Sequence, residues 1–184
     1  MELTKYLRIQ AHANRLSNHR LHAAMAPLSR EQFHAPRTGF FPSLAETLNH
    51  ILMVDLYYVG ALHGDADLRA TIDGFAPSDE LTALAARQAA CDARLVGFCD
   101  ALDAAVLDRE VQMPRDTYIQ RDRVGHVLAH LFNHQTHHRG QAHAMLSGTA
   151  IKPPQLDEFM MPSEAHLRAH DMAALGFQEH SVYR

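Results

Sequence analysis

The sequence predicts an all-α protein, a four-helix bundle with a short extra helix near its carboxyl end. Four long segments carry apolar residues at helical spacing, and stretches that contain Gly and Pro separate them. Only one stretch alternates as a strand does. The composition is even along the chain and no repeat or linker divides it, so residues 1–184 are expected to form a single domain.

The first long helix is predicted over residues 3–27, where apolar positions recur among polar ones and Pro27 ends the pattern. The Ser-Arg-Glu-Gln stretch at 29–32 then opens a short helical turn. Residues 35–42 contain Gly and two Pro, so they are predicted to form a loop before the next helix.

The second helix is expected to begin sharply after Ser43. The Ser43 hydroxyl can accept a hydrogen bond from the backbone N–H of Glu46 while the Glu46 side chain reaches back, which is the pattern of a capping box. The helix ends at Gly64. It is apolar on most sides, which places it at the centre of the bundle.

The second half of the chain supplies two more long helices. Ser78 is expected to cap the third, which ends near Ala105. Residues 107–120 show the strand-like alternation and are predicted to be a connector or a short hairpin. A fourth helix covers residues 121–146, and a short final helix follows Ser163.

Composition excludes several classes of function. The formal net charge is −4 and no basic patch is present, which argues against nucleic acid as a partner. No apolar run reaches the length of a membrane span, and the charged, periodic amino terminus is unlike a signal peptide. The two cysteines, Cys91 and Cys99, lie about two helical turns apart, roughly 12 Å, too far for a disulfide. A cytoplasmic protein is expected.

The fourth helix contains four histidines within the stretch HLFNHQTHHRGQ, residues 130–141. Residues three and four apart share a helix face, so His134 and His138 lie one turn apart on the apolar face, where two imidazoles can converge on one ion. His130 and His137 lie at the edge of that face. The predicted inward stripe consists of Val127, Leu131, His134, His138, Ala142 and Met145.

The second helix offers a matching residue, His50, within a segment that is apolar nearly all round. A buried neutral imidazole needs partners for its nitrogens, and three that face one another across a bundle are best satisfied by a metal. Alternatives stay open at this point, because a lone core histidine is usually a hydrogen-bonded structural residue and an H-x-x-x-H pair is common on helices. The cysteines are interpreted as core residues.

The stretches LAETLNHILMVD in the second helix and HLFNHQTHHRGQ in the fourth resemble those of the DinB-like family of bacterial proteins. The order of the other pieces is also similar, from AHANRL in the first helix to PPQLDEF after the fourth. The resemblance covers roughly residues 5–160. It implies a four-helix bundle, typically a homodimer, that holds a divalent metal with three histidines.

Carried over by position, the ligands implied by the resemblance are His50, His134 and His138. Arg139 and Gln141 match the end of the family motif, without a defined role. In the first helix His12 replaces an aromatic residue that the family often has, and it would lie at the mouth of the pocket or add a polar group to it. Two further imidazoles lie near the proposed site, so a substitute ligand stays open: His130 and His137.

Three imidazoles leave a coordination position for water or substrate, as in catalytic zinc sites, although nickel or iron would suit the same ligands. Zinc can activate a water for hydrolysis or hold a thiol as its thiolate. Relatives implied by the resemblance conjugate low-molecular-weight thiols such as bacillithiol or mycothiol, or isomerise a substrate with the help of a thiol. Glu46 is a weak candidate for general base, and its capping role competes with this.

Three functions therefore stay open. The first is a metal-dependent thiol S-transferase that acts on a small electrophile, with a low-molecular-weight thiol as cosubstrate. The second is a metal-dependent hydrolase, and the third is a stress-related metal-binding protein without catalysis. A homodimer is also expected, since Leu128, Phe132 and Leu146 lie away from the ligand stripe and would serve either the core or a symmetric interface.

Overall fold

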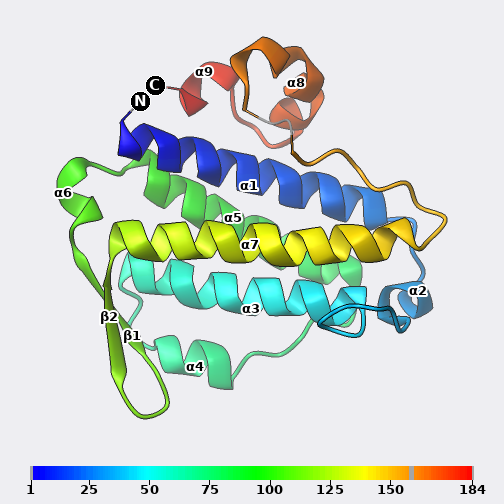
Figure 1. Cartoon of the computed structure of the whole chain (residues 1–184), viewed down its shortest axis with the longest axis horizontal. Helices are drawn as coiled ribbons and strands as arrows, with labels where there is room; N and C mark the ends of the chain where they lie inside the picture. Colours follow the sequence, from blue (N-terminus) through cyan, green and yellow to red (C-terminus); the bar gives the residue numbers. More distant parts are fainter. Residues whose placement is uncertain (1, 158–159, 184) are drawn as a thin grey trace.

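The computed structural model describes residues 2–157 and 160–183. Four long helices pack side by side with their axes roughly aligned, and the last short helix of the chain lies against the first long helix (Figure 1). This confirms the four-helix bundle. The long helices are α1 (Leu3–Met25), α3 (Leu44–His63), α5 (Leu81–Asp100) and α7 (Val124–Ser147).

The core lies between these four helices and consists of the apolar faces that the sequence spacing predicted. Leu52 and Leu62 of α3 and Leu131 of α7 are fully buried. Burying one such side chain stabilises the fold by about 1.5–3 kcal/mol. The majority of the α3 residues are buried, so this helix is central, as its apolar character predicted.

The two helices that follow Ser29 and Ser43 begin where the sequence predicted. Ser29 and Gln32 form a complete capping box at the start of α2 (Arg30–His34). At α3 the Ser43 hydroxyl accepts from the Glu46 N–H at 3.1 Å. The reciprocal bond is not formed there: the Glu46 carboxylate lies 3.4 Å from the Ser43 hydroxyl instead of the backbone N–H, because the hydroxyl can donate as well as accept.

Two boundaries in the second half differ from the prediction. Helix α5 begins at Leu81, and its N-cap is Glu80 and not Ser78. Asn49 holds the Ser78 backbone outside the helix, because its amide oxygen accepts a hydrogen bond from the Ser78 N–H at 2.7 Å. The end of α5 is Asp100, and a separate short helix follows it. The remaining short helices of this half are α4 (Leu68–Asp73) and α6 (Ala104–Leu107).

The alternating stretch forms a β-hairpin, the second of the two structures predicted for it. Strands β1 (Glu110–Pro114) and β2 (Ile119–Arg123) pair antiparallel, with Val111 opposite Asp122. Helix α7 therefore begins at Val124, slightly later than predicted, since β2 uses the preceding residues. The hairpin lies beside α4, at one end of α3 and α7 (Figure 1).

The carboxyl-terminal segment packs against α1 as a small separate layer. It contains η1 (Pro162–Glu164), α8 (Ala165–Ala174) and α9 (Glu179–Val182), so the helix predicted after Ser163 is present. A second apolar cluster joins this layer to the bundle through Leu16 of α1. The other members of this cluster are Met160, Met172 and Val182.

The two thiols and the apolar residues away from the ligand stripe lie in the core of the described part of the chain. Cys91 and Cys99 are buried free thiols, as predicted. Leu128, Phe132 and Leu146 are buried within this one chain, so they offer no surface for a dimer. None of the described helices is long and apolar enough to cross a membrane.

Candidate metal centre

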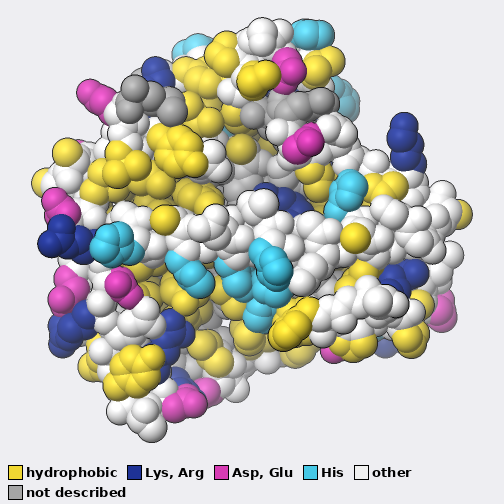
Figure 2. Space-filling view, in the orientation of Figure 1, with side chains coloured by type: hydrophobic (Ala, Val, Ile, Leu, Met, Phe, Trp, Pro, Cys, Tyr) yellow, Lys and Arg dark blue, Asp and Glu magenta, His cyan; other side chains and the backbone are white. Residues whose placement is uncertain are grey.

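The structure brings His50, His134 and His138 together, the three residues that the sequence singled out. His50 lies near the middle of α3, and the other two lie one turn apart on α7, which packs directly against α3. One nitrogen from each ring lies within 4.8 Å of the others. The Nε2 atoms of His50 and His134 are 3.0 Å apart. Several histidine side chains gather along α7 on one face of the molecule (Figure 2).

Burial keeps these imidazoles neutral. It lowers the pKa of His50 to about 4, helped by the neighbouring His138. Burial and the surrounding histidines lower the pKa of His134 to about 3. The pKa of His138 is also lowered, first by burial, although its hydrogen bond to Gln141 acts in the opposite direction. Neutral rings carry the free lone pair that a metal ligand needs at pH 7.

The donor set fits a divalent metal ion. Two nitrogens on one tetrahedral zinc are roughly 3.3 Å apart, since each Zn–N bond is about 2.0–2.1 Å long. The 3.0 Å between His50 and His134 is close to that value. Two neutral Nε2 atoms at this distance can share at most one proton, whereas a cation between them satisfies both lone pairs. The cluster could therefore hold a metal.

A hydrogen-bond chain fixes the orientation of the His138 ring. The Nδ1 atom of His138 lies 2.8 Å from Gln141 Oε1, and the amide nitrogen of Gln141 lies 3.1 Å from His137 Nε2. The amide oxygen accepts, so Nδ1 carries the proton and Nε2 is left as the ligand atom. This gives Gln141 and His137 a positioning role. By contrast, the buried Nδ1 of His134 has no such partner among the described residues.

The other histidines that the sequence placed near the site differ in position. His130 is exposed, and its ring lies 6.2 Å from that of His134 and 5.0 Å from that of Tyr58. His12 is buried, but its Nε2 lies 3.1 Å from Asp100 and its ring contacts Phe177. The contacts of His12 are thus with α5 and the carboxyl-terminal layer, and none is with the three-histidine cluster.

Two cavities border the cluster, one lined by His50 and the other by His134. The first, of about 330 Å³, is lined by His50 with Phe41, Phe75 and Met53, and Glu46 stands at its exposed rim. The second, of about 190 Å³, is lined by His134 and carries an arginine from the hairpin. Met53 lines both cavities, so the two are neighbours, and each is lined by one histidine of the cluster. The second cavity is formed by Met53, Val54, Tyr57, Tyr58, Ile72, Arg115, His130 and His134.

A buried polar network lies on the adjacent face of α7, and sequence reasoning missed it. Asp55 of α3 and Asp92 of α5 are both buried, and Gln88 donates from one nitrogen to both of them, at 2.7 and 3.0 Å. Burial raises the pKa of Asp55 to about 7 and that of Asp92 to about 6, with Asp92 also raising that of Asp55. A charged residue in an apolar helix, such as Asp55, was the available signal.

Arg139 is the cation of this network. It is buried, and it donates to the side-chain oxygens of Asn14 and Asn18 at 2.5 and 3.0 Å. The amide of Asn18 in turn donates to Asp92 at 3.0 and 3.1 Å. Arg139 therefore neutralises buried carboxylate charge through an amide relay, which gives a structural role to the arginine that follows His138 in the sequence.

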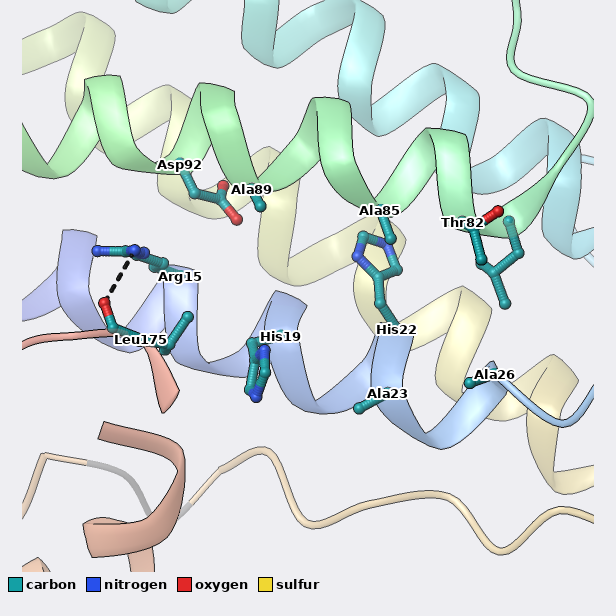
Figure 3. A pocket seen from close by; sticks show the side chains of 11 residues that line it. Arg15, His19, His22, Ala23, Ala26, Thr82, Ala85, Ala89, Asp92 and Leu175 are labelled. Atoms are coloured by element: carbon teal, nitrogen blue, oxygen red, sulfur yellow. Dashed lines mark hydrogen bonds between the residues drawn. The ribbon is translucent and has the colours of Figure 1, made fainter. Parts of the chain in front are cut away.

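A separate cavity of about 270 Å³ lies between α1 and α5 and has Asp92 of the network in its wall (Figure 3). None of the three clustered histidines lines it. His22 does, and its ring is half-buried, so that burial lowers its pKa to about 4. Arg15 points to the carboxyl-terminal layer, where it donates to the Leu175 carbonyl at 3.2 Å.

Comparison with known proteins agrees with the resemblance in the sequence. The model of a protein family described as the DinB family matches residues 5–171. A search of curated proteins finds no match.

Proposed function

The chain belongs to the DinB family, and from this premise we propose that it is a metal-dependent thiol S-transferase whose ligands are His50, His134 and His138. The observation that carries the proposal is the convergence of three neutral imidazole nitrogens within 4.8 Å on two facing helices. Three protein ligands leave a coordination position open, which is typical of catalytic sites. Zinc is the first candidate, with nickel or iron as alternatives.

When bound, a divalent metal favours the thiolate form of a thiol, and the thiolate is the nucleophile in sulfur transfer. In the transfer, the thiol loses its proton, its sulfur forms a bond to the electrophilic carbon, and the leaving group departs with the former bonding pair. His50, His134 and His138 stay neutral throughout, and Gln141 holds the His138 ring in place. Glu46 lines the larger cavity and not the smaller one, so the thiol proton leaves to solvent, and a base role for Glu46 would require the proton to reach it through water.

Two cavities that meet at one cluster support transfer over hydrolysis. A transferase needs room for a thiol and an electrophile at the same centre, whereas a hydrolase needs room for one substrate and a water. The larger cavity has apolar walls from Phe41, Phe75 and Met53 and suits the electrophile. The smaller cavity, which Met53 also lines, suits the thiol.

The test combines metal analysis with a conjugation assay. Protein purified without exposure to a chelator is expected to contain about one divalent metal ion for each chain. His134→Ala should lose both metal and conjugation of a small thiol to an alkyl halide. His126→Ala is the matched control, since His126 lies on the same helix but is exposed and outside the three-histidine cluster, and it should keep its metal.

Each alternative predicts a different result. Conjugation that persists after the metal is removed would reject the transferase mechanism. Product formed without any thiol would favour a metal-dependent hydrolase. A protein that binds metal but conjugates no thiol and hydrolyses no ester would be a non-catalytic metal-binding protein, the third function that the sequence leaves open.

A further inference from the structure

Arg115 occupies an unusual position beside the three-histidine cluster. It lies in the turn of the hairpin, is half-buried, and lines the smaller cavity together with His134 and His130. Its guanidinium carbon lies 5.2 Å from the ring centroid of Tyr57 and 5.7 Å from that of Tyr58. These cation–π contacts hold the guanidinium against the wall of the cavity.

The partners of Arg115 are all neutral. Its Nη2 donates to the Tyr58 hydroxyl at 2.9 Å and to Gln120 Oε1 at 2.8 Å, and its Nε donates to Gln120 at 3.0 Å. In the described part of the chain no carboxylate forms an ion pair with it. The nearby acids are engaged elsewhere, since Asp116 pairs with Arg69 and Asp122 accepts from the Gln120 amide at 2.6 Å.

Two hydrogen-bond donor groups at the smaller cavity have no acceptor among the described residues. The Nη1 group of Arg115 has no acceptor among the described residues, and the Tyr58 hydroxyl accepts from Arg115 but donates to none of them. A half-buried guanidinium without a counter-ion is costly, and a planar acceptor of opposite charge offsets that cost. The donors and the charge match a carboxylate.

We propose that Arg115, with Tyr58 and His130, is an anchor for the carboxylate of a small acid that binds in the cavity beside His134. This inference rests on the proposed function, because it assigns the smaller cavity to a thiol that carries a carboxylate group. The volume of about 190 Å³ admits only a small molecule. The hairpin thereby becomes part of the substrate site, although it lies outside the four-helix core.

The test measures binding of four small probes to zinc-loaded protein by calorimetry: 3-mercaptopropionate, 2-mercaptoethanol, propionate and methyl phosphate. Arg115→Gln should weaken the binding of 3-mercaptopropionate and of propionate at least tenfold, because it removes a charge-assisted hydrogen bond to the carboxylate. The affinity for 2-mercaptoethanol, which has no carboxylate, should change less than twofold. Arg121→Gln is the matched control. It removes one exposed positive charge from the same hairpin and should change no probe more than twofold.

Further variants separate recognition from folding. Arg115→Lys keeps the charge but loses the planar fork, so an intermediate loss of three- to tenfold for propionate is expected. The Arg115 Nε–H resonance should shift when propionate is added to the wild type, which reports contact independently of turnover. If Arg115→Gln melts the hairpin, the Arg115→Lys variant and this resonance still decide the question.

Three outcomes would overturn the inference: equal losses for 2-mercaptoethanol and 3-mercaptopropionate, no loss for propionate, or tighter binding of methyl phosphate than of propionate. Failure of the proposed function is distinguishable from these. A protein that binds no zinc contradicts the metal site, whereas propionate titrated into the metal-free protein tests the Arg115 anchor alone.

Discussion

Asp55 and Asp92 lie on facing helices inside the bundle and share one hydrogen-bond donor, the Nε2 of Gln88, at 2.7 and 3.0 Å. Two carboxylates that share a donor in a buried site cannot both ionise cheaply. Arg139 is the cation that lowers the pKa of both acids from within the hydrogen-bonded network, and Arg15, outside that network, also lowers the pKa of Asp92. The network is therefore neutral when one of the two acids keeps its proton.

The fold should lose stability as the pH rises and Asp55 ionises. The pKa of Asp55 is raised from 3.8 to about 7, so its contribution is fully present below pH 4 and is lost as the pH rises toward 7. Asp55→Asn removes the transition, because an amide stays neutral. The free energy of unfolding of the variant minus that of the wild type should increase by on the order of 2 kcal/mol from pH 5 to pH 8. Urea unfolding at the two pH values measures this difference. A difference independent of pH would contradict the assignment.

Removing the cation should have the opposite effect. Arg139→Met leaves buried carboxylate charge without compensation, so the free energy of unfolding should fall by about 3–5 kcal/mol at pH 8. The loss should shrink at pH 5, where the two acids are protonated. Combining Arg139→Met with Asp55→Asn should restore part of the stability. Arg121→Met, at an exposed position, serves as the control and should change stability by less than about 0.5 kcal/mol.

Gln141 should control metal affinity without being a ligand. Its Oε1 accepts from the His138 ring, so Gln141→Ala frees the ring to rotate and should weaken zinc binding roughly 10- to 100-fold. Competition with a chromophoric chelator measures the affinity. Gln141→Glu, which keeps an acceptor, should bind zinc at least as tightly as wild type. Unchanged affinity in the alanine variant would show that packing alone orients His138.

The two roles considered for Glu46 can be separated. Ser43→Ala removes the hydroxyl that caps α3 and should cost about 1 kcal/mol of stability, while Glu46→Gln should cost little because the side chain is exposed. A base function for Glu46 requires that Glu46→Gln lower kcat, with KM and metal content unchanged. A variant with wild-type kcat at every pH would leave Glu46 with a role only at the start of the helix.

The sequence was sufficient for features that depend on one helix. His134 and His138 were placed on an inward face by spacing alone, and the start of α3 followed from Ser43. Features that need several chain segments were not predictable in this way. Ser78 looked like a cap, but a contact with Asn49, 29 residues away, redirects its backbone.

The buried network shows the same limit. Asp92 and Gln88 of α5 and Asn18 of α1 are each ordinary polar residues on a helix, and nothing in their local pattern marks them as buried. Their burial depends on which faces of three helices meet. Arg115 is similar, because its role beside His134 follows from where the hairpin folds back and not from its neighbours in sequence.

Helix α7 joins the metal centre to the core within a single helical turn. His134 and His138 face the cluster, while Gln135 and Arg139, each one position later, are buried toward the network. A one-residue insertion or deletion between Leu131 and His134 would rotate everything beyond it by about 100°. Both sites would then be lost at once. The stretch can vary by substitution but not in length, and an alignment of its relatives should be free of gaps there.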